Sequence, residues 1–313
     1  MHHIGYLLTD GFQIMGLATQ SVFEYANKVA GEDFYALHNF SVAGGSVLSS
    51  LGMSITTTPA SQADHMDSWM ICGVADPLAS PASPDERSFL QRTGKSARRI
   101  AAICTGGFVL AEAGLLAKRR ATTHWFFARE MQARFPEIQV EHDRIYIVDG
   151  PIWTSAGMTA GLDMALAMVA KDLGEEVARG VAHKLVMHQH RTGGQTQHSE
   201  MLALAPKTDR IQNALNYARK NLMRPLTVEE LAEEANLSPR QFSRVFSAET
   251  GLSPSKAIEG LRLEAARLMI EQSRHSLEVI ARETGFRDRR HMREVFIRGY
   301  GVAPQMMRRE GRA

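Results

Sequence analysis

An internal repeat in the last third of the chain constrains the fold most, because a pattern that occurs twice has to fold twice. VEELAEEANLSPRQFSRVFSAETGLSP (228–254) aligns with LEVIARETGFRDRRHMREVFIRGYGVAP (277–304) at a spacing of 49–50 residues. Both segments contain a Val-Phe pair and end in Gly-x-x-Pro. Residues after 207 show no strand pattern, so the repeat predicts an all-α region with two helix-turn-helix units.

The first unit carries the local signals of a helix, a tight turn and a second helix. Thr227 is placed to cap the first helix, and Asn236 tolerates the left-handed conformation needed to leave it. Ser238 is placed to cap the second helix, with Pro239 at its first position and Gln241 completing a capping box.

The second unit repeats this plan, with Ser276 as the cap and Gly285 at the turn. Apolar residues have the spacing to hold each pair of helices together: Leu231, Leu237, Phe242 and Phe246 in the first unit, and Ile280, Phe286, Met292 and Phe296 in the second.

The residues left outside are polar and basic. Arginine reaches guanine O6/N7 and phosphate oxygens, so the second helix of each unit is expected to contact DNA. The alternative is a solvated basic helix face. Candidate DNA-binding residues are Ser238, Arg240, Gln241, Arg244, Arg287, Arg289, Arg290 and Arg293.

The charge distribution favours DNA contact by the C-terminal part. Residues 1–206 hold 16 Lys+Arg against 20 Asp+Glu, and residues 207–313 hold 20 against 14. The C-terminal part thus carries a net charge of +6 and the rest of the chain one of −4, which indicates that the C-terminal part binds a polyanion.

The segment from about Asn213 to Met307 resembles the DNA-binding domain of AraC/XylS-type regulators. The resemblance lies mainly in GFRDRRHMREVFIRGYGVAP, where Met292 replaces the usual Phe. It implies two helix-turn-helix units joined by a long helix (Ser255–Gln272), whose recognition helices enter successive major-groove segments of double-stranded DNA.

The first ~180 residues alternate between short apolar runs and helical patterns. This order predicts an α/β domain, a flavodoxin-like doubly wound sheet that is mostly parallel. The expected domains are 1–189 and 208–313, joined by a linker at 190–207, where the helical pattern is lost. Expected strands are His3–Leu8, Phe34–Val42, Ser68–Cys72, Arg99–Ile103 and Ile145–Val148; expected helices are Ile14–Val29, Pro84–Lys95, Gly107–Leu116, Trp125–Phe135, Met158–Lys171 and Glu175–Met187, with a small hairpin at Ser46–Thr58.

One stretch of the first part of the chain indicates a cysteine nucleophile with a histidine in reach. It reads IAAICTGGFVLAEAGLLAKRRATTHW (100–125). Cys104 follows a buried strand and precedes two glycines and a helix, which predicts an elbow that projects the thiol above the sheet. The amides after Cys104 are expected to lower its pKa or to hold a ligand oxyanion, and His124 could act as a base.

This stretch resembles the ThiJ/PfpI (class I glutamine amidotransferase-like) superfamily. Together with WTSAGMTAGLDMAL (153–166) and HRTGGQTQ (190–197), it is similar to the GlxA-type AraC regulators, which fuse such a domain to a tandem helix-turn-helix. The resemblance implies a transcription regulator whose front domain senses a small molecule and forms a homodimer. Some relatives respond to amine- or amino-acid-derived metabolites.

The sequence departs from the catalytic members at two positions. Gly16 stands where the acidic partner of the cysteine is expected, and Thr105 stands where amidases often have His. A nucleophile without its acid loses the group that activates it, so no catalysis is expected. A cysteine-dependent amidase or hydratase fused to a DNA-binding domain is the alternative, with Asp163 able in principle to orient His124. A DNA binder without any ligand is a third hypothesis.

The expected ligand pocket comprises Cys104, Thr105, Gly106, His124, Trp125 and Trp153. Aromatic walls suit a cation such as a quaternary ammonium; alternatively the aromatic residues are plain core, and Cys104 merely fills a turn. His188, His190 and His198 are too loosely spaced to indicate a metal, and no cofactor is expected.

Two cysteines, no apolar run of ~18 residues and no secretion signal at the start favour a cytoplasmic protein without a membrane partner.

Overall fold

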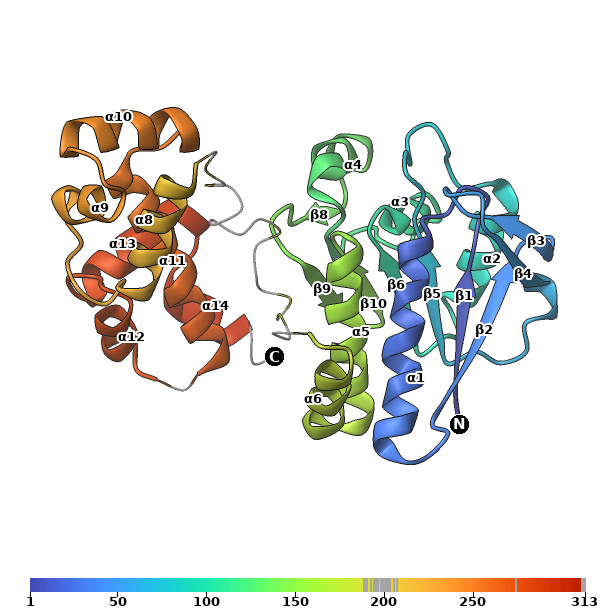
Figure 1. Cartoon of the computed structure of the whole chain (residues 1–313). Coiled ribbons are helices and arrows are strands. Elements are labelled where there is room, and N and C mark those ends of the chain that lie inside the picture. The colour runs from blue at the N-terminus through green and yellow to red at the C-terminus, as the bar shows by residue number, and fades with distance from the viewer. Residues whose placement is uncertain are drawn as a thin grey trace. The chain divides into compact units, whose positions relative to one another are not determined.

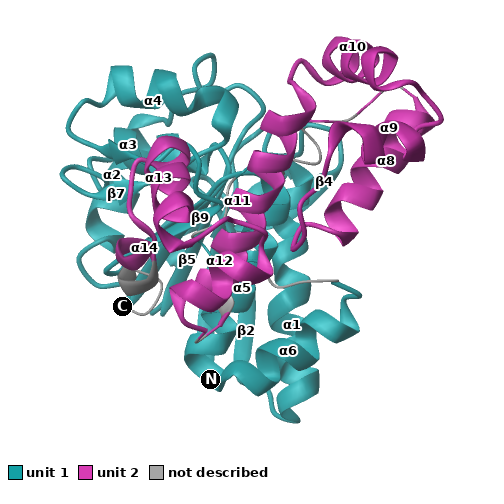
Figure 2. Cartoon of the chain, turned by 90° about the vertical axis from the view of Figure 1, so that its left-hand side faces the viewer, with its two compact units in different colours: residues 1–197 teal, residues 198–313 magenta. Residues whose placement is uncertain are grey.

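The computed structural model describes residues 1–187, 191, 193, 197, 204, 206, 208–273 and 275–310. The chain forms two compact units, residues 1–197 and 198–313 (Figure 2). The division falls inside the segment expected to be a linker (190–207), most of which lies outside the described residues.

The first unit is built on an eight-stranded sheet with the order β3-β4-β2-β1-β5-β6-β10-β9 (Figure 1). Neighbouring strands from β4 to β10 run parallel, while β3 and β9 are antiparallel edges. The strands are β1 (His2–Leu7), β2 (Tyr35–Ser41), β3 (Gly45–Leu48), β4 (Ser54–Pro59), β5 (Ser68–Cys72), β6 (Arg99–Ile103), β9 (Tyr146–Asp149) and β10 (Ile152–Ser155). The predicted α/β class and mostly parallel sheet are confirmed.

Helices cover both faces of this sheet. The helices are α1 (Thr19–Ala30), α2 (Pro84–Thr93), α3 (Gly106–Glu112), α4 (Ala128–Arg134), α5 (Met158–Leu173) and α6 (Glu175–Lys184). Alternate strand residues face opposite cores: Tyr6 and Met70 belong to the core shared with α1, α5 and α6, whereas Leu7 and Ile71 belong to the core shared with α2 and α3.

Three details differ from the sequence expectation. The predicted helices at 14–29 and 125–135 each begin with a short 3-10 turn, Ile14–Ala18 and Trp125–Phe127. Strand β10 was not expected, because it has four residues and two of them, Thr154 and Ser155, are buried hydroxyls. The segment before His124 holds a two-residue strand, β7 (Arg120–Ala121), which pairs with β8 (Gln139–Val140) outside the main sheet.

The second unit is all-α in its described part, as predicted. Its helices are α8 (Asp209–Lys220), α9 (Val228–Glu234), α10 (Pro239–Thr250), α11 (Pro254–Gln272), α12 (Leu277–Glu283), α13 (Arg289–Tyr300) and α14 (Pro304–Glu310). The helix α11 joins two small cores. Its Ala257 and Leu261 belong to the first core, and its Ala266 and Ile270 belong to the second.

Candidate functional site

The first helix-turn-helix forms as its caps predict. The Thr227 side chain accepts a hydrogen bond from the Glu230 backbone, and Asn236 has the left-handed φ of 53° that ends α9. Ser238 and Gln241 form the capping box of α10. These contacts set the direction in which α10 leaves the loop after α9. They also place the first helical turn of α10 at the surface.

The second helix-turn-helix follows the same geometry as the first. Ser276 caps α12, and Gly285 has a φ of 74° at the turn. Asp288 caps α13 by accepting from His291. The predicted packing residues are in place: Phe242 and Phe246 are buried in the first core, and Ile280, Phe286, Met292 and Phe296 in the second.

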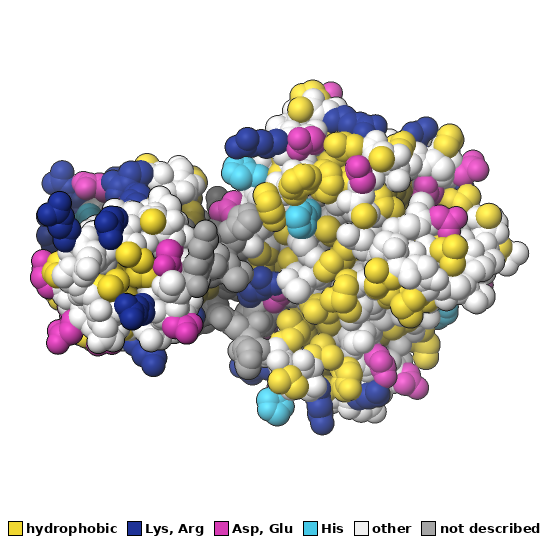
Figure 3. Space-filling view, turned by 45° about the horizontal axis from the view of Figure 1, so that its top comes forward, with side chains coloured by type: hydrophobic (Ala, Val, Ile, Leu, Met, Phe, Trp, Pro, Cys, Tyr) yellow, Lys and Arg dark blue, Asp and Glu magenta, His cyan; other side chains and the backbone are white. Residues whose placement is uncertain are grey.

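All eight candidate DNA-binding side chains are exposed. Arg240 and Arg244 lie on α10, and Arg289, Arg290 and Arg293 lie on α13, whereas Arg287 lies in the turn before α13. Ser238 and Gln241 contribute to the capping box as well, since the Ser238 hydroxyl donates to Gln241 Oε1 at 2.8 Å. Figure 3 shows Lys and Arg side chains gathered on part of the helical unit.

Three of the candidate DNA-binding arginines hold surface ion pairs. Arg287 pairs with Asp288 (3.4 Å), Arg289 with Glu278 (2.7 Å), and Arg290 with Glu294 (3.1 Å). Exposed pairs of this kind contribute about 0–1 kcal/mol, so a phosphate or a guanine edge can replace the carboxylate at little cost. Two helix-turn-helix units with basic second helices define a DNA-binding protein.

In the α/β unit (residues 1–197), Cys104 forms the predicted elbow between β6 and α3. Its φ is 56°, a left-handed conformation that is uncommon for a residue with a side chain. The Thr105 hydroxyl donates to the Val74 carbonyl at 2.5 Å, and the Thr123 hydroxyl donates to the Cys104 carbonyl at 3.1 Å. Gly106 is needed here because a β-carbon at that position would overlap the Ile71 carbonyl.

The expectation that the elbow lowers the pKa of the Cys104 thiol is wrong. The residue is 4% exposed, and burial raises the pKa of Cys104 to about 11, although hydrogen bonds from Thr105 act in the opposite direction. Burial disfavours the thiolate, so Cys104 carries its proton at neutral pH and is a poor nucleophile.

Gly16, the position aligned with the missing acid, lies against the other cysteine. A β-carbon on Gly16 would be 2.9 Å from Cys72 Sγ and 3.5 Å from Cys72 Cβ. The position therefore has no space for a carboxylate side chain unless Cys72 moves. Asp163, the other carboxylate considered as a partner of His124, is 1% exposed and accepts hydrogen bonds from the backbone and side chain of Arg191.

His124 and Trp125 form a half-exposed turn on the chain that follows β7. The Phe126 backbone N–H donates to His124 Nδ1 at 3.3 Å, which places the proton of a neutral ring on Nε2. The His124 ring lies 5.6 Å from the Trp125 ring, and its Cδ2 would lie 3.7 Å from a β-carbon on Gly157. Trp125 is 48% exposed and Phe126 is 62% exposed, so this turn presents an aromatic surface.

Trp153 does not join this surface. It is 3% exposed on β10, and its ring lies 5.7 Å from the Arg99 guanidinium and 5.6 Å from Lys171 Nζ. Arg99 begins β6, whereas Cys104 follows the end of that strand. Trp153 pairs with Ala101 in the middle of β6, and its ring belongs to the core on that face of the sheet. The structure thus supports the alternative that this ring is plain core, and Trp153 does not stand with the exposed side chains of the His124–Trp125 turn.

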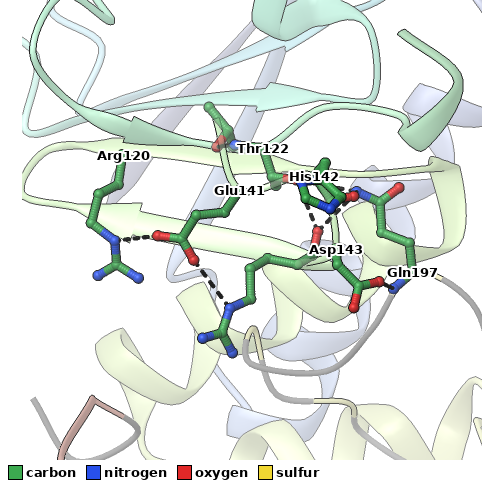
Figure 4. Close-up of polar contacts among 8 residues, drawn as sticks. Arg120, Thr122, Glu141, His142, Asp143 and Gln197 are labelled. Atoms are coloured by element: carbon green, nitrogen blue, oxygen red, sulfur yellow. Dashed lines mark hydrogen bonds and ion pairs between the residues drawn. The ribbon is translucent and has the colours of Figure 1, made fainter. Parts of the chain in front are cut away.

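Gln197 is a residue of this region that sequence reasoning missed (Figure 4). Its side-chain nitrogen lies within hydrogen-bond distance of four oxygens, and its side-chain oxygen accepts from the Trp125 backbone N–H at 2.8 Å. The four oxygens are Thr122 Oγ1 (3.2 Å) and the carbonyls of Thr123 (2.9 Å), His142 (2.9 Å) and Arg144 (3.2 Å). HRTGGQTQ ends in this glutamine, but its partners are 53–75 residues away in sequence.

The described part of the chain forms no metal-binding cluster. No group of three or more His, Cys, Asp and Glu side chains there is arranged to hold a metal ion. His188, His190 and His198 lie outside the described residues. None of the described helices combines the length and the apolar character required to cross a bilayer.

Comparisons with known proteins agree with both units. Residues 231–310 match the helix-turn-helix domain family, and residues 22–171 match the DJ-1/PfpI family. The chain is 31% identical over 322 residues to the HTH-type transcriptional regulator GlxA of Rhizobium meliloti, covering 99% of this chain and 96% of that protein. It is 29% identical over 305 residues to the regulator GbdR of Pseudomonas aeruginosa, covering 96% and 83%.

A crystal structure of an AraC family transcriptional regulator from Pseudomonas putida has the same fold over 59% of this chain and all of that chain, with 21% identity and a TM-score of 0.54. The chain belongs to the family of AraC-type helix-turn-helix transcriptional regulators with a DJ-1/PfpI domain, as the sequence resemblance indicated. It is a DNA-binding regulator.

Proposed function

We propose that the DJ-1/PfpI unit of this regulator is a sensor that binds a small metabolite at the Cys104–His124 elbow without transforming it. The observation that carries the proposal is the His124–Trp125 turn. The half-exposed imidazole of His124 and indole of Trp125 lie next to each other, directly after Thr123, whose hydroxyl is hydrogen-bonded to the Cys104 carbonyl at the elbow. The unit that carries them is joined to a DNA-binding unit. Exposed aromatic faces suit a quaternary ammonium or another amine or amino-acid derivative.

A thermal-shift screen tests the sensor. A ligand that binds the folded state raises the melting temperature by mass action. The full chain is screened with a metabolite panel that includes tetramethylammonium as the simplest cation probe. The shift is expected to vanish in Trp125→Ala and to persist in Trp153→Phe, because Trp153 lies in the core. A panel without any shift supports a DNA binder that takes no ligand.

The DNA-contacting residues of the proposal are Arg240 and Arg244 on α10 and Arg287, Arg289, Arg290 and Arg293 around α13. Their exposure and the weakness of their ion pairs support this assignment. Ser238 and Gln241 stand at the exposed start of α10, where a recognition helix reaches base edges.

The proposal includes a cytoplasmic homodimer, in line with the family resemblance. The segment 190–207 contains the joint between the units, and a ligand acts by favouring one placement of the DNA-binding units over another. Sedimentation equilibrium of the full chain tests the dimer.

A cysteine-dependent amidase or hydratase is the alternative, and the left-handed φ of Cys104 is the observation in its favour. The protonated thiol and the closed space at Gly16 oppose it. Turnover of small amides or isonitriles that disappears in Cys104→Ser would establish the enzyme and remove the purely sensing function.

A further inference from the structure

Three described residues of the segment expected to be a linker are fastened to the first compact unit (residues 1–197). Arg191, Gly193 and Gln197 each contact that unit through the chain or the side chain. A β-carbon on Gly193 would lie 2.5 Å from the Tyr146 carbonyl, so the backbone passes directly over β9 at this point. Unit 1 accordingly extends to Gln197.

Arg191 anchors the start of this segment to a buried carboxylate. Asp163 Oδ1 accepts from the Arg191 backbone N–H at 2.9 Å, and Asp163 Oδ2 accepts from Arg191 Nε at 2.9 Å. Arg191 Nη2 also contacts the Thr159 hydroxyl at 3.2 Å. A carboxylate with 1% exposure requires a compensating charge, so detaching Arg191 is unfavourable.

Gln197 fastens this part of the chain at a second point, to the His124–Trp125 turn. Its amide bridges two stretches of backbone, 122–125 and 142–144, and its own N–H donates to Asp143 Oδ1 at 3.3 Å. The bond from the Trp125 N–H joins Gln197 to the residue after His124. A movement of this turn therefore acts directly on the chain that leads into the DNA-binding unit.

We propose that the two docked residues Arg191 and Gln197 act as a latch that links ligand binding at the His124–Trp125 turn to DNA binding, with Gln197 as its positioning residue. The inference rests on the proposed function, because it takes that turn as the ligand site. A ligand that holds the turn in this conformation strengthens the bond to Gln197, and docking of Gln197 strengthens ligand binding equally.

Opening the latch lengthens the tether between the two units. If Gln197 undocks while Arg191 stays in place, the last fastened point moves back by six residues, which is up to about 20 Å of extended chain. A longer tether lowers the effective concentration of one DNA-binding unit of a dimer at the second half of an operator. Binding to a duplex with a single half-site does not depend on the tether.

The test compares Gln197→Glu and Gln197→Ala with Gln139→Glu in the full chain. The Glu variant replaces the amide nitrogen by a charged oxygen that faces four oxygens, while Gln139 is exposed on β8 and provides the same charge change. Hydrogen exchange of the peptide that covers residues 122–127 reports on docking, and circular dichroism verifies that each variant is folded. DNA affinity is measured on one-site and two-site duplexes selected by the wild-type chain from a random pool.

We expect both Gln197 variants to exchange the Trp125 amide at least tenfold faster, to bind the two-site duplex at least fivefold more weakly, and to bind the one-site duplex as the wild type does. Gln139→Glu is expected to change none of these. Unchanged exchange would show that Gln197 does not hold the turn, and faster exchange with unchanged two-site affinity would show that the latch transmits nothing. Either result overturns the inference.

Failure of the proposed function gives different results. A wild-type chain that binds one-site and two-site duplexes equally well lacks the proposed dimer, and this removes the tether effect. A wild type that discriminates between the duplexes but gives no thermal shift with any probe lacks the proposed ligand. In the second case the Gln197 measurements still decide whether the latch controls DNA binding.

Discussion

Gly285 lies against the carbonyl of Leu222, so close that a β-carbon on residue 285 would overlap that oxygen. Arg262 Nε donates to the same carbonyl at 3.2 Å. The turn of the second helix-turn-helix is thus packed on the loop between α8 and α9, and Arg262 of α11 lies between them. Gly285→Ala introduces this overlap together with an unfavourable positive φ. We expect it to lower the free energy of unfolding by about 2 kcal/mol or more.

Gly251 provides the matched control. Its φ of 73° is close to the 74° of Gly285, but a β-carbon on Gly251 would meet nothing within 4 Å. Gly251→Ala should therefore cost only the backbone strain, about 1 kcal/mol. Urea denaturation of both variants measures the difference, and equal costs would contradict the packing described for Gly285.

Removal of a recognition arginine should weaken operator binding. Arg244→Ala and Arg290→Ala are each expected to lose about 1–3 kcal/mol if the side chain contacts a base. If the contact is to a phosphate, the loss is similar across sequences and the salt slope falls by about one. Gel shifts at several salt concentrations separate these two cases.

Arg219→Ala is the control for charge alone, since Arg219 is an exposed arginine on α8 of the same unit. If Arg219→Ala weakens binding as much as Arg290→Ala, general electrostatics accounts for the effect, and α13 has no special role.

The contact between Gly16 and Cys72 can be measured by a double-mutant cycle. Gly16→Ala places a methyl group 2.9 Å from Cys72 Sγ and should cost about 1–3 kcal/mol through overpacking. The same substitution in a Cys72→Ala background should cost much less, because the sulfur is gone. Thermal denaturation measures the four proteins, and an unchanged cost would show that the space at Gly16 is not limited by Cys72.

The Cys104 thiol should react slowly and only at high pH. Burial raises its pKa from 9.0 to about 11, so iodoacetamide labelling of the native Cys72→Ala protein should rise towards pH 11, compared with pH 9 in urea. The folded state keeps the proton that the unfolded state releases first. The contribution of Cys104 to stability is therefore complete below about pH 9 and is lost as the pH rises to about 11. Fast labelling at pH 7 would contradict a buried, protonated thiol.

Local signals made the helical unit predictable from sequence. The caps at Thr227, Ser238 and Ser276 and the turn residues Asn236 and Gly285 each act within a few residues, and the structure places all five as predicted. The parallel sheet was predictable for a similar reason, because its buried strands are continuous apolar runs.

Long-range contacts explain what the sequence did not reveal. The role of Gln197 depends on partners that fold onto it from more than fifty residues away, and no local pattern marks them. Burial raises the pKa of Cys104, and the sequence signals of the helix after the elbow do not indicate that the thiol is buried. The sequence pattern predicts no strand at residues 152–155, so it does not show that Trp153 pairs with Ala101 in the sheet and is buried there.

The shared helix α11 also limits how chains of this kind can vary. It has 19 residues and contributes to both cores, so it acts as a ruler of about 28 Å. Inserting one residue at its middle would turn everything beyond by about 100° and advance it by about 1.5 Å. Single substitutions on α11 can be tolerated one at a time. A change in its length would instead rotate the recognition helix α13 relative to α10.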